Sequence, residues 1–298
     1  MAGAARVAPS NLPLTHGLSW LRQSVVGRLL RLKLAVFGLS VVTLVVIGAV
    51  FAPLLAPYTP TEIVGDSAEK PSAKHLLGTD SIGRDQVSRL LHGARASLTV
   101  SVLATLLGTV AGCTIGLVAA YFKGVVDALL MRTMDALLSM PGLVLPLALL
   151  AAMGGGVPTV SLALGIGFMP GVARLMRGQA LAQLERDYVL AAVAGGASHM
   201  RIMVRYVAPN CMAPIIVAAS LGMSVAVIAE AGLSFLGLGV TPPTPTWGSM
   251  LSTGFKAIRS TPWLVYAPGG AIFLLVLSLN FLGDAIRDVL DPRLRGAL

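Results

Sequence analysis

Long runs without a charged residue alternate along this chain with short segments in which Lys, Arg, Asp and Glu gather. The six runs cover residues 34–61, 96–122, 136–173, 206–229, 231–255 and 260–283 of 298. Each could cross a hydrocarbon core about 30 Å thick as an α-helix, which rises about 1.5 Å per residue. The pattern therefore predicts an all-α polytopic membrane protein.

Two of these runs do not each correspond to one crossing helix. Residues 136–173 carry GGGVP at 154–158 near their midpoint, which predicts two helices joined by a tight turn. The second half of 231–255, TPPTPTWGS, holds three prolines, a composition that leaves backbone groups unpaired in lipid. We therefore predict six transmembrane helices, over 34–56, 97–121, 133–152, 157–174, 211–231 and 263–283.

The composition and the placement of charge support this topology. Only 12% of the residues are charged, against about 25% in a soluble globular domain. The net charge of +9 could indicate a nucleic-acid partner, so its distribution matters. Before the first span there is no Asp or Glu, only Arg6, Arg22, Arg28, Arg31 and Lys33, which places the N-terminus in the cytoplasm by the positive-inside rule. Six spans return the C-terminus there, with the basic loop 174–210 on the same side, so the charge follows the topology and no nucleic acid is expected.

The segment after the first span contains a pattern that resembles a nucleotide site. Gly78 and Gly83 have the spacing of a P-loop. Arg84 and Asp85 stand where that motif needs Lys and Ser or Thr to hold phosphate and Mg²⁺. No ATP site is expected in this chain.

The same segment carries four residues of types that bind metals, His75, Asp80, Asp85 and His92. Their spacings of five, five and seven residues place them on no common helical or strand face. We expect turns and helix caps from the Gly and Asp residues here, and no metal site.

Small residues and prolines mark positions inside the predicted spans. Gly108, Gly112 and Gly116 form a stripe at i, i+4 and i+8 that would let another helix approach closely. Prolines interrupt the third and fourth spans, which fits either a bend around a pathway or ordinary packing, and Met140 and Pro141 are the candidate pathway residues there. Cys113 and Cys211 are expected to be small packing residues without a disulfide.

Glu230 is the acidic residue with apolar sequence on both sides. A carboxylate near mid-bilayer is a functional candidate, so Glu230 joins the candidate pathway residues. The predicted span places it at the outer end of the fifth helix, and both interpretations stay open.

The loop between the fourth and fifth spans has a helix–turn–helix pattern. Gly195 and Gly196 would end the first helix, and Ser198 is the expected N-cap of the next. Arg201 and Arg205 share one side of that second helix and have no carboxylate on it. Their partners could be anionic lipid headgroups or acidic groups of a cytoplasmic protein.

Several stretches resemble one family, the C-type permease subunits of dipeptide, oligopeptide and nickel ABC importers. They are HLLGTDSIGRDQVSRLLHGARASL from residue 75, DALLSMPGLVLPLAL from 135, EAGLSFLGLGVTPPTPTWGSM from 230 and NFLGDAIRDVLDPRLR from 280. The resemblance covers about residues 30–295 and implies a type I ABC importer permease fold with both termini in the cytoplasm.

The loop also resembles the segment with which such permeases dock their ATPase. Ala191, Ala192, Gly196 and Pro209 match the family pattern in register. Leu190 stands where the family has Glu, and Tyr206 and Ala208 depart from its Ile and Leu. The resemblance implies an ATPase-coupling site made of Leu190, Ala191, Ala192, Gly196, Ser198, Arg201, Arg205 and Pro209.

The resemblance further implies partners and a cargo. The partners would be a B-type permease subunit, two cytoplasmic ABC ATPases that hold ATP and Mg²⁺, an extracytoplasmic substrate-binding protein and membrane lipids. The chain itself would bind no cofactor and be no enzyme, since its spans carry no catalytic set. Peptides are the expected cargo of this bacterial inner-membrane protein, with nickel chelates or other small solutes as the alternative and an ion-coupled transporter as a more distant one.

The resulting organisation has four parts: a basic cytoplasmic tail over 1–33, the first span with its outer segment over 34–96, a permease core with its coupling loop 175–210 over 97–284, and a C-terminal tail over 285–298. A short amphipathic helix over 18–33 is one expectation for the tail, and disorder is the other.

Overall fold

The computed structural model describes residues 27, 29, 30 and 32–290. Most of the helix expected over 18–33, and the end of the C-terminal tail from residue 291, lie outside these described residues. Within them the secondary structure is helical apart from turns and two isolated β-bridges, Ile63 with Arg84 and Thr79 with Asp85. The predicted all-α class is confirmed.

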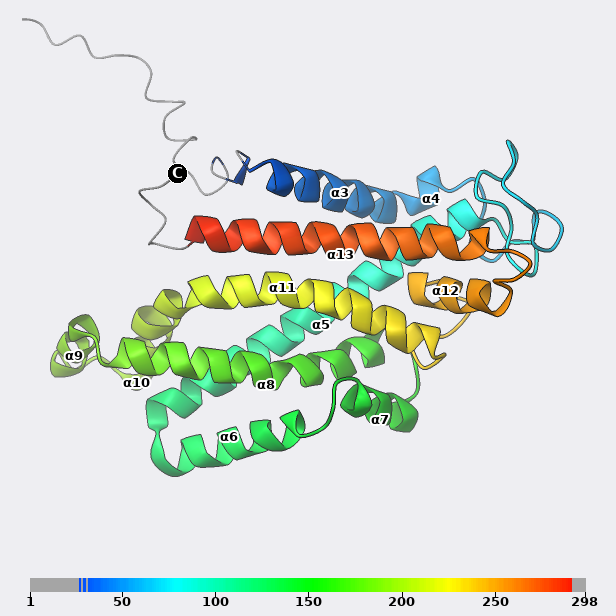
Figure 1. Ribbon diagram of the computed structural model, residues 1–298. Coiled ribbons are helices and arrows are strands. Elements are labelled where there is room, and N and C mark those ends of the chain that lie inside the picture. The colour runs from blue at the N-terminus through cyan, green and yellow to red at the C-terminus, as the bar shows by residue number, and fades with distance from the viewer. Residues whose placement is uncertain (1–26, 28, 31, 291–298) are drawn as a thin grey trace, which may run out of the picture.

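The helices are α3 (Lys33–Val50), α4 (Ala52–Leu55), α5 (Gln86–Phe122), α6 (Gly124–Leu138), α7 (Val144–Met153), α8 (Val157–Leu184), α9 (Asp187–Ala194), α10 (His199–Arg201), the π-helix η1 (Ile202–Val207), α11 (Ala208–Phe235), α12 (Trp247–Lys256) and α13 (Trp263–Leu290). Figure 1 shows the long helices side by side, with α9 and α10 at one end of the bundle and α12 with the segment after α4 at the other.

Five helical stretches in the described part of the chain are long and apolar enough to cross a membrane: Lys33–Val50, Gln86–Phe122, Val157–Leu184, His199–Phe235 and Trp263–Leu290. The third predicted span, 133–152, is not one helix, because the chain leaves the helix between α6 and α7. Pro141 lies in this break beside Gly142, whose φ of +43° suits a residue without a Cβ. Two short helices therefore replace the single span that the hydropathy pattern predicted.

The boundaries also differ from the predicted parts. α5 begins at Gln86, so the division proposed at residue 96 falls inside a helix. α13 continues to Leu290, past the predicted end of the core at 284. Hydropathy missed these ends because charged and polar residues extend the helices beyond the apolar runs.

The glycine stripe of α5 packs directly on α8. A Cβ added to Gly108 would lie 2.9 Å from the carbonyl oxygen of Gly165, and one added to Gly112 would lie 2.7 Å from that of Met169. A Cβ at Gly116 would overlap the carbonyl oxygen of Ala173. The three glycines lie where the backbone of α8 approaches α5, and α5 and α8 form one closely packed pair.

Candidate functional site

The loop between α8 and α11 folds as the helix–turn–helix pattern predicts. The backbone N–H of Gly195 donates to the carbonyl of Ala191 at 2.9 Å, and that of Ala197 to the carbonyl of Ala192 at 3.0 Å, which closes the end of α9. Gly196 adopts a φ of +73° there. Ser198 is the N-cap residue of α10, although its side chain makes no capping hydrogen bond.

The second helix of this loop does not end before the fifth span. Residues 199–235 run as α10, η1 and α11 without interruption, and η1 supplies one turn of π-helix, which sequence periodicity does not reveal. The loop is therefore connected rigidly to α11 on one side. Its other connection is the short turn from α8 into α9.

One face of the loop is buried against the bundle. Val189, Ile202 and Val207 are at most 2% exposed. They pack in one cluster with residues of α5, α8 and α11 that includes Ala120, Met176, Ala180, Cys211 and Ile215. The loop is thus part of the folded body rather than a free connection.

The opposite face of the loop is exposed and largely apolar. Leu190 and Val193 are each 55% exposed, and Met200 and Val204 are 66% and 57% exposed. Ala191, Gly196 and Pro209 are exposed as well, and Ala192 is half-buried. A contiguous exposed surface of this kind is typical of a docking site for another protein.

Arg201 and Arg205 are exposed beside these apolar side chains. Neither takes part in an ion pair within the described chain. Ile202 and Met203 of the same helical stretch are buried. The structure places the two cations on the exposed face of the loop.

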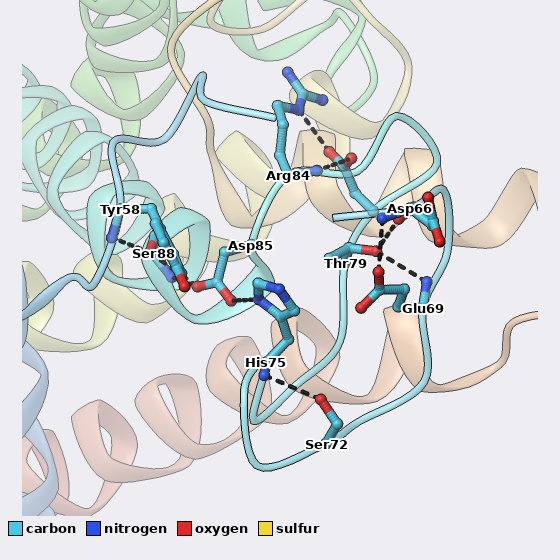
Figure 2. A network of polar contacts seen from close by, with 10 residues as sticks. Tyr58, Asp66, Glu69, Ser72, His75, Thr79, Arg84, Asp85 and Ser88 are labelled. Atoms are coloured by element: carbon cyan, nitrogen blue, oxygen red, sulfur yellow. Dashed lines mark hydrogen bonds and ion pairs between the residues drawn. The ribbon is translucent and has the colours of Figure 1, made fainter. Parts of the chain in front are cut away.

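At the other end of the bundle, the segment after α4 is held by a buried polar network (Figure 2). Nδ1 of His75 lies 3.1 Å from Oδ1 of Asp85, and both side chains are buried. Oδ2 of Asp85 accepts from the backbone N–H of Ser88 at 2.8 Å and from its hydroxyl at 2.9 Å. Asp85 is the N-cap of α5, so the predicted cap role is confirmed.

Asp80 organises the turn before α5. Its Oδ1 accepts from the backbone N–H groups of Ile82 and Arg84, each at 3.0 Å, and its Oδ2 is 2.7 Å from Nε of Arg84. Nε of Arg89 approaches the same oxygen at 3.4 Å. Within the described residues no three His, Cys, Asp or Glu side chains gather as a metal site would require. The network stabilises a turn before α5. The contact between His75 and Asp85 was not predicted from their spacing in the sequence.

A cavity of about 590 Å³ opens beside the break between α6 and α7. Met140 and Pro141, both predicted pathway residues, line it together with Pro146 of α7, Phe168 of α8 and Ile228 of α11. The lining is almost entirely apolar.

Glu230 is not among the residues that line this cavity. It is fully buried in α11, where its Oε1 accepts from the hydroxyl of Ser234 at 2.7 Å, and its Oε2 has no hydrogen-bond partner. A buried carboxyl with one oxygen unpaired is a costly arrangement inside the helix bundle.

Two ion pairs tie α6 to α8. Arg177 donates from Nε and Nη2 to both carboxylate oxygens of Asp127 at 2.5 Å, and Nη2 of Arg174 donates to Asp135 at 2.6 Å. The hydrogen bonds from Arg177 hold the pKa of Asp127 below its usual value. These contacts connect a helix beside the cavity to the helix that enters the loop.

Comparison with known proteins places these features in one family. Residues 112–296 match the family described as binding-protein-dependent transport system inner membrane component, and residues 20–73 match the N-terminal transmembrane domain of oligopeptide transport permease C. The chain is 43% identical over 272 residues to a di/tripeptide transport system permease protein of Pseudomonas aeruginosa, which covers 89% of this chain and 90% of the relative. It is 46% identical over 272 residues to a dipeptide transport system permease protein of Escherichia coli, with 89% and 91% covered. A dipeptide permease of Alkalihalophilus pseudofirmus is 39% identical over 264 residues, with 88% and 87% covered.

Proposed function

This chain belongs to the family of binding-protein-dependent transport system inner membrane components, and from that premise we propose that it is the C-type permease subunit of an ATP-driven peptide importer. Its relatives are named as di/tripeptide and dipeptide transport permeases, and the similarity extends over most of their length. The chain is a multi-pass protein of the inner membrane, and the importer that it serves takes up short peptides.

The observation that carries this proposal is the two-sided segment 186–210 of the coupling loop. Its inner face packs into the bundle through Val189 and Ile202, while Leu190 and Val193 of its outer face remain open. A loop of this kind can transmit a displacement from a bound protein to the helices, because one of its faces packs on the bundle and the other is exposed for binding. The docked protein in our proposal is a cytoplasmic ATPase.

The contacts with that ATPase would differ from the family pattern at Leu190. An apolar side chain replaces an acidic one, so the docking surface combines apolar packing with the two cations Arg201 and Arg205. The ATPase cleft that fits it would carry apolar and acidic groups. We propose Ala191, Ala192, Gly196, Ser198 and Pro209 as the remaining coupling residues.

The complete importer would contain this chain, a B-type permease subunit, two ATPases and an extracytoplasmic binding protein. Both termini would lie in the cytoplasm, with α6 and α7 together forming the broken third of six crossings. ATP and Mg²⁺ would be held by the ATPases. The pathway would run beside the cavity that Met140 and Pro141 line. Glu230 would lie close to it, buried in α11, which also contributes residues to the cavity lining.

The mechanism that fits this arrangement is a switch between two packed states. Closure of the two ATPases would displace the coupling loops, and the bundle would pass from an inward-facing to an outward-facing arrangement. A broken helix suits such a switch, since the segment between α6 and α7 lacks the continuous hydrogen bonds that would hold it straight.

Purification of the chain in mild detergent with its neighbouring transport subunits tests the proposal. We expect an ATPase to co-purify, and its vanadate-sensitive turnover to rise when the binding protein and a dipeptide are added in liposomes. Robust transport by this chain alone would favour an ion-coupled transporter and overturn the proposal. Uptake of a nickel chelate but not of dipeptides would keep the importer and change its cargo.

A further inference from the structure

A contact outside the proposed docking surface joins the coupling loop to the end of α5. The hydroxyl of Tyr121 lies 2.6 Å from Nδ1 of His199, the first residue of α10. The two rings pack edge to face with centroids 5.5 Å apart, and Phe122 approaches the same imidazole with its centroid at 6.4 Å. In the tautomer with its proton on Nε2, His199 accepts the hydrogen bond from Tyr121.

The contact lies close to the glycine turn between α9 and α10. Gly195 and Gly196 separate α9 from α10, and a Cβ at Gly196 would meet nothing within 4 Å. α10 has only three residues, none of them buried. Because α10 continues through η1 into α11, the turn at these two glycines is the place where the loop can bend between α9 and α10.

α5 is suited to hold α10 because it packs closely on α8. The glycine stripe brings the two backbones together along α5, as shown for Gly108 and Gly112. After Tyr121, α5 ends at Lys123, whose φ of +53° is unusual for a residue with a side chain. That corner leads into α6, which reaches the break beside the cavity.

We propose that Tyr121 and His199 are positioning residues that brace the second half of the coupling loop on α5. A displacement of the loop then moves the α5–α8 pair, instead of being absorbed by bending at Gly195–Gly196. The brace rests on the proposed function, since it needs an ATPase that displaces the loop. Neither Tyr121 nor His199 is among the residues that we propose to contact the ATPase.

The test uses the complete transporter in liposomes and measures peptide transported per ATP hydrolysed. Tyr121→Phe removes the hydroxyl and keeps the ring, and His199→Phe keeps a ring without the acceptor. Each should lower the ratio about five-fold, the change that loss of one net hydrogen bond gives. His199→Asn, which keeps an acceptor, should stay within about two-fold, and Tyr266→Phe, a change at a 71% exposed tyrosine of α13, should have no effect.

The double variant sharpens the test. If the two residues act through one contact, Tyr121→Phe with His199→Phe is no worse than either alone. An unchanged ratio in both single variants would overturn the brace. So would loss of ATPase co-purification in both, because the pair would then serve assembly. Failure of the native chain to bind any ATPase would instead overturn the proposed function, so the two failures are distinguishable.

Discussion

Asp85 and His75 form a buried pair that joins the outer segment to α5, with 3.1 Å between Oδ1 and Nδ1. Asp85 is 2% exposed and His75 is fully buried. Because the same carboxylate caps α5 through Ser88, one side chain fixes both the start of a long helix and the course of the preceding segment.

Asp85→Ala should therefore destabilise the protein by about 2–4 kcal/mol. The change removes a helix cap, which contributes about 1 kcal/mol, and leaves a buried imidazole without its partner, which costs about 1–3 kcal/mol more. Thermal unfolding of the purified chain in detergent measures the loss. Asp66→Ala, at an exposed side chain of the same segment, is the matched control. Equal melting temperatures for the two variants would contradict the double role of Asp85.

Gly112→Ala should separate α5 from α8 locally. Its Cβ would lie 2.7 Å from the carbonyl oxygen of Met169 and from Cβ of Val172, closer than real atoms come. Such overpacking costs about 1–3 kcal/mol. Gly171→Ala on α8, where the added Cβ meets nothing within 4 Å, should lose no stability. The comparison is a difference in melting temperature, and no difference would show that the close approach is not required.

The ion pair between Asp127 and Arg177 makes a pH-dependent contribution to the attachment of α6. Since the pKa of Asp127 is lowered from 3.8 by Arg177, its stabilisation is fully present above that value. It is lost as the pH falls through the lowered pKa of the folded state. Because Arg177 is 35% exposed, the contribution should be about 1 kcal/mol or less.

Asp127→Asn removes this pH dependence. As the pH falls below about 3.8, the free energy of unfolding should decrease more for the native chain than for the variant. The double variant Asp127→Arg with Arg177→Asp should restore part of the contact with the charges exchanged. A native chain and Asp127→Asn with parallel stability profiles across this range would contradict the contribution.

Reversal of charge at both Arg201 and Arg205 should weaken ATPase association about ten-fold, since two favourable contacts become repulsive. Co-purification at fixed salt measures it. Lys256→Glu with Arg259→Glu is the matched control, because both residues are exposed at the opposite end of the bundle (Figure 1). If association is unchanged while binding to anionic vesicles falls, the two arginines contact lipid instead.

Local patterns predicted the helix–turn–helix elements between α8 and α11. The end of α9 at Gly195–Gly196 and the N-cap position of Ser198 both follow from residue types within a few positions of one another. The π-turn in η1 was missed, because a single turn with one extra residue leaves no mark in the sequence periodicity.

Contacts between distant residues escaped prediction at both ends of the bundle. His75 and Asp85 share no helical or strand face, and an irregular turn brings them together. Tyr121 and His199 lie 78 residues apart. The break between α6 and α7 was also missed, because hydropathy counts apolar residues and does not register where Pro141 and Gly142 interrupt the helix.

The sequence by itself determined that this chain is a helical membrane protein of a peptide-importer family. Several uncharged stretches are each long enough to cross a bilayer as a helix, and the family motifs are contiguous in the sequence. Only the tertiary structure decided which face of the coupling loop stays open, where Glu230 is enclosed, and that His199 meets Tyr121. These features depend on how helices remote in sequence pack together, and packing is a property of the whole fold rather than of any one segment.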